Sequence, residues 1–376
     1  MVIKDVLQKE YNMKKILTVL LATAVVLGMT GCSKKDAEKK ADSKDGFELA
    51  LITDVGTIDD KSFNQGAWEG LEAYAKDHNI THKYYKPTEK SDTACLQAID
   101  LAVKGGAKAI VTPGFLFEVP IFKAQTKYPD IKFILLDGAP HAADSFDPSI
   151  ESNTLSIFYA EHQAGFLAGY AAVIDGYRNL GFMGGMAVPA VVRFGHGFIQ
   201  GAEYAANELG LLDGTVQIKY NYTGSFDATP EAQSKAASWY KDGTEVIFGC
   251  GGAVGNSVMK AAETAGAKVI GVDVDQSSES PTVITSAMKN LSKSVYDALS
   301  DFYDGKFQGG KSVVLDAKVG GIQLPMETSK FEVFDQAKYD SIYNGFIDGS
   351  IAVSDAAYDN DCTKVPVSVV KVIAIN

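Results

Sequence analysis

The sequence predicts an α/β fold built from two doubly wound parallel-sheet domains that are joined by a hinge. From about residue 47 onward, short apolar segments typical of strands alternate with segments of helical periodicity. The same series of strands and helices restarts near residue 175. About 330 residues follow the N-terminal region, which is the length of two domains. A helix between consecutive strands is the connection that parallel strands require.

The first half, residues 47–175, carries the first of these series. Apolar runs predict strands at 47–53, 82–86, 107–112 and 132–137. Helical periodicity marks residues 60–77 and 91–104, and an apolar helix rich in Ala and Gly runs from 161 to 174. We therefore assign residues 47–175 to an N-terminal α/β domain.

The second half repeats the pattern and forms the C-terminal α/β domain, residues 176–285. Strands are predicted at 179–184, 216–220, 246–248, 268–274 and 283–286, with helices at 190–209, 229–241 and 253–265. A helix at 288–303 lies in the segment 286–306, which we expect to complete the N-terminal domain. Residues 307–376 are expected to form a C-terminal extension that packs on one domain, with short strands at 312–316 and 321–325 and a helix at 336–346.

The N-terminus has the pattern of an export signal. Lys14 and Lys15 precede an uncharged apolar run, residues 16–29, which is too short to span a bilayer as a mature helix. The segment 29–32, Met-Thr-Gly-Cys, resembles the lipobox of bacterial lipoproteins, which implies acylation of Cys32. We expect a signal peptide at 1–31 and a polar, lipidated tether at 32–46. The alternatives are a plain signal peptide with an incidental cysteine and a true start at Met13.

Composition excludes several classes of partner and site. Residues 1–31 carry four lysines and two acids, so the net charge of −12 becomes −14 for the remainder, which disfavours nucleic acid. The other cysteines, Cys95, Cys250 and Cys362, are too few and too scattered for a disulfide framework. No Cys/His pair has zinc spacing. We expect no metal, no cofactor and a monomer.

Polar and aromatic residues follow the predicted strands, where ligands bind in open α/β sheets. Asp54, Asp60, Phe63 and Asn64 follow the first strand. The two carboxylates could accept hydrogen bonds from hydroxyl groups or from the edge of a base, and the Phe63 ring could stack on a planar ligand. One carboxylate could instead cap the next helix, and Phe63 could be a core residue. In the second half Phe226 mirrors Phe63. Two aromatic rings from opposite domains would clamp a planar ligand when the hinge closes.

Three further positions complete the candidate site. Gly252 lies in a Gly-rich turn, which allows a ligand to approach backbone N–H groups, although a simple tight turn explains it equally well. Asp273 ends a buried strand and could bind both hydroxyls of a ribose. Lys289 is predicted to open the helix at 288–303, where a nearby carboxylate or ligand oxygen would stabilise it; a plain surface lysine is the alternative.

Four segments in order, 59–65 (DDKSFNQ), 163–169 (QAGFLAG), 195–201 (GHGFIQG) and 271–276 (GVDVDQ), resemble the basic membrane protein family of lipoproteins. The best-understood members look like purine nucleoside receptors. The resemblance implies a periplasmic-binding-protein type I fold that delivers guanosine, inosine or adenosine to an ABC transporter permease from the outer face of the cell membrane or the periplasm. It implies a base stacked between Phe63 and Phe226. It also implies that Asp54 and Asp137 read base or ribose, and that Gly252, Asp273 and Lys289 hold ribose hydroxyls.

Three other functions are considered. The loop 53–60 superficially resembles the calcium-binding loop of nucleoside hydrolases, but Ile52 replaces the first aspartate and one extra residue follows Gly56, so calcium ligands are lost or shifted. A sugar or autoinducer receptor would share the fold, because fold does not fix ligand. A structural surface antigen would bind nothing. We predict a receptor rather than an enzyme.

Overall fold

The computed structural model describes residues 47–54 and 56–375. The predicted signal peptide, Cys32 and the tether lie outside the described residues. Within the described part of the chain, no helix combines the length and the apolar character needed to cross a membrane. The described residues form one compact unit.

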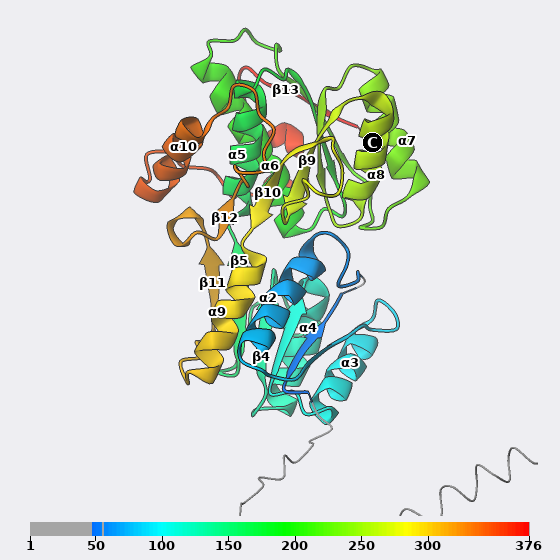
Figure 1. Ribbon diagram of the computed structural model, residues 1–376, viewed down its shortest axis with the longest axis vertical. Helices are drawn as coiled ribbons and strands as arrows, with labels where there is room; N and C mark the ends of the chain where they lie inside the picture. Colours follow the sequence, from blue (N-terminus) through cyan, green and yellow to red (C-terminus); the bar gives the residue numbers. More distant parts are fainter. Residues whose placement is uncertain (1–46, 55, 376) are drawn as a thin grey trace, which may run out of the picture. The chain divides into compact units, whose positions relative to one another are not determined.

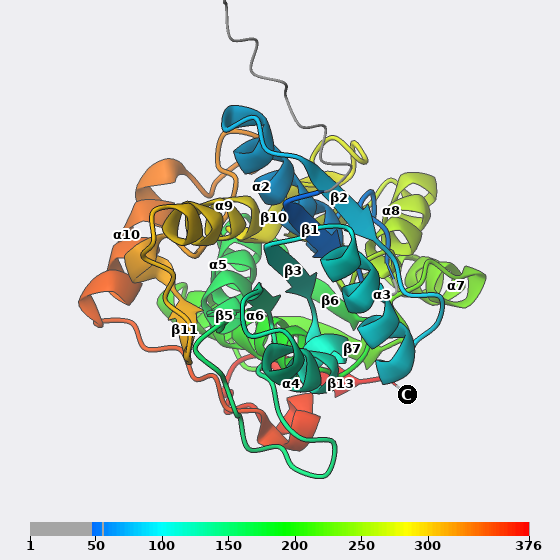
Figure 2. The ribbon, with the colours of Figure 1, turned by 90° about the horizontal axis from the view of Figure 1, so that it is seen from below.

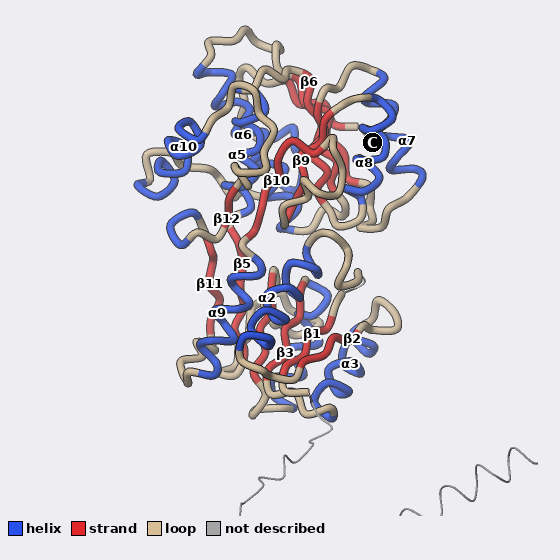
Figure 3. Tube along the Cα trace, in the orientation of Figure 1, coloured by secondary structure: helices blue, strands red, loops and turns tan. Residues whose placement is uncertain are grey.

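Two mainly parallel sheets organise this body, which confirms the predicted fold class (Figures 1 and 3). The first sheet has six strands in the order β11-β5-β4-β3-β1-β2. Their bounds are Leu49–Ile52 for β1, His82–Tyr85 for β2, Ala109–Pro113 for β3, Lys132–Leu136 for β4, Thr154–Tyr159 for β5 and Lys311–Leu315 for β11.

The second sheet has seven strands in the order β12-β10-β9-β8-β6-β7-β13, of which only the β10–β12 pair is antiparallel. Their bounds are Asn179–Gly184 for β6, Gln217–Tyr222 for β7, Val246–Cys250 for β8, Lys268–Asp273 for β9, Val283–Lys289 for β10, Ile322–Gln323 for β12 and Lys371–Ala374 for β13.

Helices cover both faces of the first sheet (Figure 2). Leu49 and Leu51 pack in the cluster that contains α2 (Phe63–Asp77) and α9 (Leu291–Tyr303), while Ala50 and Ile52 pack with α3 (Asp92–Lys104) and α4 (Glu118–Lys127). Because both faces are buried, β1 is apolar throughout instead of alternating. We call this sheet with α2, α3, α4 and α9 the first lobe.

The second lobe consists of the second sheet with α5 (Glu161–Ile174), α6 (Pro189–Glu208), α7 (Pro230–Lys241), α8 (Val254–Ala265) and α10 (Gln336–Asp348). Helices α5 and α6 pack unusually closely, with glycines on both helices. A Cβ atom at Gly165 or Gly169 would overlap the backbone of α6, and one at Gly197 or Gly201 would overlap the backbone of α5. The segments 163–169 and 195–201, which carry part of the family resemblance, therefore supply the glycines of this helix contact.

The chain passes between the lobes at three adjacent places, which form the hinge. They are Ala160 between β5 and α5, Asn290 between β10 and α9, and the segment 316–321 between β11 and β12. Hydrogen bonds tie them together: Ala160 N–H donates to Leu315 O (3.0 Å) and Asn290 N–H donates to Gly321 O (2.9 Å). The short 3₁₀ helix η2 (Ala317–Val319) lies in the third crossing.

Two of the differences between the structure and the sequence-based expectation concern strands. Strand β5 was not predicted, because Thr154 and Ser156 interrupt its apolar pattern, although both side chains are fully buried. Residues after 307 supply strands to both sheets, β11 to the first and β12 and β13 to the second, because each extends a sheet edge left open by the repeated series. The domain boundaries themselves stay a prediction.

Candidate ligand-binding site

A cavity lies where the carboxyl ends of strands from the two sheets meet. About 560 Å³ of space there is not filled by protein atoms, and part of this space is open to solvent. One wall is apolar and comes from the start of α6, including Val191 and Phe194. A second, outer cavity of about 970 Å³ shares Asp54, Phe63 and Phe226 with this inner cavity.

The structure brings all nine sequence-predicted site residues into the walls of these two cavities. Six of them line the inner cavity: Asp54, Phe63, Asp137, Phe226, Asp273 and Lys289. The other three, Asp60, Asn64 and Gly252, line the outer cavity. Their contacts with a ligand stay a prediction. Their contacts with one another can be described directly.

The two aromatic rings come from different lobes. Phe63 is the first residue of α2, and Phe226 lies in the loop after β7. Phe226 lies against two glycines: a Cβ atom at Gly185 would overlap its ring, and one at Gly251 would come within 3.2 Å of Cδ1. These glycines therefore give the ring its place on the cavity wall.

Asp54, Asp60 and Asn64 form one hydrogen-bonded group at the outer cavity. Asn64 Nδ2 donates to Asp54 Oδ1 (2.9 Å) and to Asp60 Oδ2 (2.8 Å). Asp60 also accepts from the backbone N–H groups of Ser62 (2.9 Å) and Gln65 (3.1 Å), so it holds the start of α2. Burial raises the pKa of both Asp54 and Asp60. Asp60 thus accepts hydrogen bonds from the first turn of α2, although the N-cap residue itself is Ser62 and not an aspartate as considered from the sequence.

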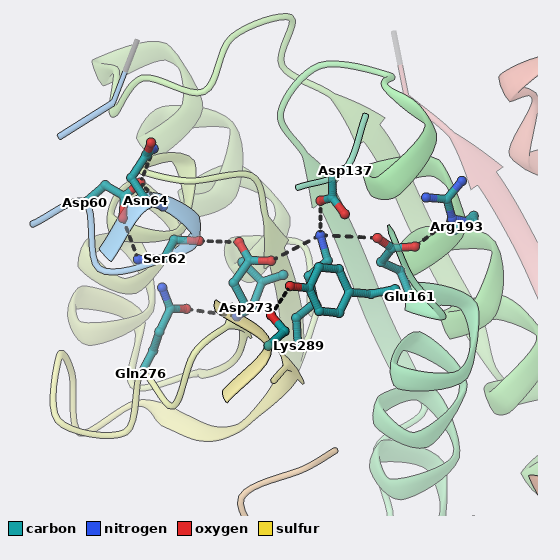
Figure 4. Close-up of polar contacts among 12 residues, drawn as sticks. Asp60, Ser62, Asn64, Asp137, Glu161, Arg193, Asp273, Gln276 and Lys289 are labelled. Atoms are coloured by element: carbon teal, nitrogen blue, oxygen red, sulfur yellow. Dashed lines mark hydrogen bonds and ion pairs between the residues drawn. The ribbon is translucent and has the colours of Figure 1, made fainter. Parts of the chain in front are cut away.

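Lys289 is the centre of a buried charge cluster (Figure 4). It ends β10 and does not open a helix as the sequence suggested, because α9 begins only at Leu291. Its ammonium is ion-paired with Asp137 and lies 3.2 Å from Glu161 Oε1 and 3.7 Å from Asp273 Oδ1. The side chain is 3% exposed, so it is not a surface lysine.

Aromatic rings complete the surroundings of this ammonium. Its nitrogen lies 4.8 Å from the centre of the Phe63 ring, 5.3 Å from Phe194 and 5.5 Å from Tyr159. Cation–π contacts of this length favour a charged ammonium. The positive charge of Lys289 therefore lies directly beside the proposed aromatic clamp.

The charges in the cluster shift one another's pKa values. Burial raises the pKa of Asp137 to about 7, against the opposing effect of Lys289 and with a contribution from Glu161. Burial also acts to raise the pKa of Glu161, but Lys289 and Arg193 outweigh it and lower the value. Burial disfavours the charge of Lys289, yet the carboxylates of Asp137, Glu161 and Asp273 together raise its pKa. Lys289 is charged at every physiological pH.

Direct contacts join the lobes beside the cavity, and Figure 4 shows the one between Ser62 and Asp273. Ser62 Oγ donates to Asp273 Oδ2 (2.5 Å), and Gln276 Nε2 donates to Lys61 O (2.6 Å). Asp137 and Asp273 have φ angles of 54° and 66°, in the left-handed region that non-glycine residues rarely adopt. Such backbone strain is frequent at functional sites, and here one carboxylate from each lobe carries it.

Several residues of this cluster were not predicted from the sequence. Glu161 is fully buried between Lys289 and Arg193, whose Nε lies 2.6 Å from Glu161 Oε2. An acid at a helix start and an arginine within a helix are ordinary in sequence, so neither signals a buried pair. Ser62 lies in the segment 59–65 and Gln276 in the segment 271–276, both of which carry the family resemblance. That location in the sequence could have identified the two residues as part of the site.

The structure also shows whether Asp54 and Asp60 could bind calcium as the loop of nucleoside hydrolases does. The amide group of Asn64 lies between the carboxylates of Asp54 and Asp60 and donates to both, which is where a shared cation would have to sit. Across residues 47–54 and 56–375, no group of three or more His, Cys, Asp or Glu side chains is arranged to hold a metal ion. These residues do not fit a calcium site.

Comparison with known proteins identifies relatives of the chain. The family described as "ABC transporter substrate-binding protein PnrA-like" matches residues 47–355. The ABC transporter nucleoside-binding protein BmpA of Lactococcus lactis is 28% identical over 368 residues, covering 90% of this chain and 99% of the relative. Basic membrane protein D of Borreliella burgdorferi is 28% identical, with coverages of 89% and 95%. A lipoprotein of Pyrococcus abyssi is 29% identical, with coverages of 81% and 74%.

Solved structures show the same fold. A solute-binding protein of an ABC transporter from Aeropyrum pernix superposes with a TM-score of 0.72 at 23% identity, covering 85% of this chain and 98% of that one. The lac repressor dimer gives a TM-score of 0.52 at 13% identity, with coverages of 78% and 96%. At these identities the likeness concerns the fold alone, which is the predicted periplasmic-binding-protein type I fold.

Proposed function

The chain belongs to the PnrA-like family of ABC transporter substrate-binding proteins, and from that membership we propose that the solute it captures is a purine nucleoside. Membership makes the chain a substrate-binding protein of an ABC transporter and not an enzyme, as predicted.

The observation that carries the proposal is the pair Phe63 and Phe226, which come from opposite lobes and line the same inner and outer cavities. Aromatic side chains bind the faces of bases, and this stacking tolerates different bases. A purine between the two rings is the planar ligand that fits such a pair. The Lactococcus lactis relative, named as a nucleoside-binding protein, supports the same class of ligand.

The polar wall suits the sugar. Asp273 and Lys289 lie at the floor of the cavity, and a carboxylate accepts hydrogen bonds from hydroxyls while an ammonium donates to their oxygens. Gly252 has a φ of 53° in the turn into α8 and lines the outer cavity. We assign the ribose to this wall, and Asp54 and Asp137 to recognition of the base or the ribose.

We further propose that acylated Cys32 anchors the receptor to the outer face of the cell membrane, beside its permease. Relatives with lipoprotein names support this location. In cells, Cys32→Ser should move the protein from the detergent phase to the aqueous phase on Triton X-114 partitioning, while Ser33→Ala should leave it in the detergent phase. Unchanged partitioning of the Cys32→Ser protein would refute lipidation at this residue.

The ligand class can be tested without assuming a ligand. Receptor purified under non-denaturing conditions is denatured, and the released small molecules are identified by mass spectrometry. We expect guanosine, inosine or adenosine in the wild-type extract and a reduced amount from a Phe63→Ala protein. A pentose or hexose released instead would favour the sugar-receptor alternative.

A further inference from the structure

Some contacts between the lobes are made by residues that do not face the ligand. Lys61 and Ser62 of the first lobe lie just before α2, and Gln276 and Glu279 of the second lobe lie in the loop between β9 and β10. These four residues line neither the inner nor the outer cavity. We call them the latch.

The side chain of Gln276 is held in place by its own lobe. Its backbone N–H donates to Ser286 Oγ (3.0 Å), and its Oε1 accepts from Val272 N–H (3.0 Å). Gly271 makes room for it, because a Cβ atom there would come within 2.5 Å of Oε1. The remaining group, Nε2, donates across the lobe boundary to Lys61 O (2.6 Å). The donor is therefore oriented by contacts within the second lobe.

The acceptor, the carbonyl of Lys61, is held in place by the first lobe. Lys61 has a φ of 62°, in the left-handed region, and its N–H donates to Gln65 Oε1 (3.2 Å). The next residue, Ser62, donates its N–H to Asp60 Oδ1 (2.9 Å). Backbone strain of this kind is frequent at ligand clamps and switch regions. Donor and acceptor are thus both oriented by contacts inside their own lobes.

A second hydrogen bond connects the latch to the ligand cavity. The Ser62 hydroxyl donates to Asp273 Oδ2 (2.5 Å), and Asp273 lines the inner cavity. A residue of the first lobe therefore orients a cavity carboxylate of the second lobe while the lobes are in contact. The ion pair of Lys61 with Glu279 (3.5 Å) is 40% and 27% exposed, so it contributes little.

Opening of the lobes has to break both hydrogen bonds. Ser62 and Gln276 are 0% and 1% exposed, so separating the lobes would transfer their polar groups to water. Each intramolecular hydrogen bond has a modest net contribution, larger when the acceptor is charged as in Asp273. The apparent affinity of a receptor is proportional to the fraction of it in the binding-competent state. Contacts that stabilise the closed state therefore raise the affinity.

We propose that the latch stabilises the closed lobes directly, so that Gln276 sets the affinity for every solute by the same factor without touching the solute. Gln276 is then a positioning residue. A residue that contacts the solute would instead change the affinities of related solutes by different factors. The latch requires no particular solute; only the probes chosen to test it rest on the proposed function.

The variant that tests the latch is Gln276→Glu. It keeps the acceptor for Val272 N–H but replaces the donor to Lys61 O with a carboxylate oxygen, which repels a carbonyl. We place it in a Lys61→Met background, so that the new carboxylate cannot pair with the Lys61 ammonium. Thr328→Val in the same background is the matched control. It breaks the hydrogen bond from Thr328 Oγ1 to Asp275 Oδ2 (2.6 Å), which holds the same loop without crossing between the lobes.

Calorimetric titration with guanosine, inosine and 2′-deoxyguanosine measures the effect. Gln276→Glu should weaken binding by about 3- to 30-fold relative to the background, by factors that agree within about threefold for the three ligands. The control should stay within about twofold of the background, because an exposed hydrogen bond contributes little. An affinity equal to that of the control, or factors that differ more widely among the ligands, would overturn the proposal.

A second variant covers the case in which Gln276→Glu does not fold. Ser62→Ala removes the other hydrogen bond from the first-lobe side and should also weaken all three ligands by a common factor; an unchanged affinity would overturn the latch. If the wild-type receptor binds no purine nucleoside, the proposed function fails and the latch does not. The same titrations are then made with the solute that is released from the purified receptor.

Discussion

At the scale of single residues, the buried ammonium of Lys289 stabilises three carboxylates that would otherwise repel one another. It reaches Asp137 of the first lobe as well as Glu161 and Asp273 of the second. Removing one partner of a buried ion pair leaves uncompensated charge and costs about 3–5 kcal/mol. Lys289 therefore contributes to folding as well as to the cavity wall.

We predict that Lys289→Met lowers the free energy of unfolding by about 3–5 kcal/mol at pH 7.5. The loss should be smaller at pH 5, because protonation neutralises the carboxylates that lost their cation. Lys293→Met is the matched control: Lys293 pairs with Asp297 on an exposed helix face, and the change should cost about 0.5 kcal/mol or less. Urea denaturation at both pH values measures these effects, and equal losses in the two variants would contradict the role of Lys289.

The aromatic clamp makes a second prediction at this scale. Phe63→Ala should weaken guanosine binding by about 1–3 kcal/mol, the typical contribution of one aromatic side chain stacked on a base. Phe146→Ala is the control, because Phe146 is 92% exposed on a loop of the first lobe. Fluorescence or calorimetric titration compares the two, and equal affinity of the Phe63→Ala and wild-type proteins would rule out stacking on this ring.

At the scale of elements, the close contact of α5 and α6 positions the polar floor of the site. Glu161 begins α5, and Arg193 and Phe194 lie in the second turn of α6, so the spacing of these helices sets the distance between Glu161 and Arg193. Glycines at the contact, among them Gly169 and Gly201, allow that spacing.

Gly201→Ala should therefore destabilise the protein by about 1–3 kcal/mol, because a methyl group overlaps the backbone of α5 near Phe166. Gly255→Ala is the matched control within helix α8. There the nearest atom is 3.7 Å away, and the gain in helix propensity is up to about 1 kcal/mol. Thermal unfolding followed by circular dichroism measures both, and a Gly201→Ala protein as stable as Gly255→Ala would refute the packing argument.

Elements that a local sequence pattern defines could be predicted, whereas contacts that form only in the folded chain could not. Continuously apolar elements such as α5 and β6 were predicted with the bounds that the structure shows, because an uninterrupted apolar run defines them. Lys289 was placed on the wrong element, since a β-strand with a polar end and a helix start look alike there. Glu161 and Arg193 were missed because their pairing depends on tertiary contacts between α5 and α6 that leave no local pattern.

At the scale of the whole described body, three hinge crossings connect two lobes that also contact each other across the cavity. The contacts across it include Ser62 with Asp273 and Gln276 with Lys61. A ligand held by both lobes favours the state in which these contacts form, since it binds that state better. The state recognised by the permease would then be the ligand-bound one.

Small-angle X-ray scattering tests this movement. Adding saturating guanosine to ligand-free receptor should reduce the radius of gyration. The Phe226→Ala protein should need more guanosine to show the same change, because it has lost the ring that the second lobe contributes. A radius of gyration that stays constant while guanosine is shown to bind would contradict closure.

The measurement that tests the central claim most directly is calorimetric titration of ligand-free receptor with guanosine, inosine, adenosine, cytidine, ribose and galactose. The proposed stacking of a base between Phe63 and Phe226, with its ribose at the floor near Asp273, requires that the purine nucleosides bind most tightly. Ribose alone should bind weakly or not at all. Tight binding of ribose or galactose, with no binding of any purine nucleoside, would contradict the account.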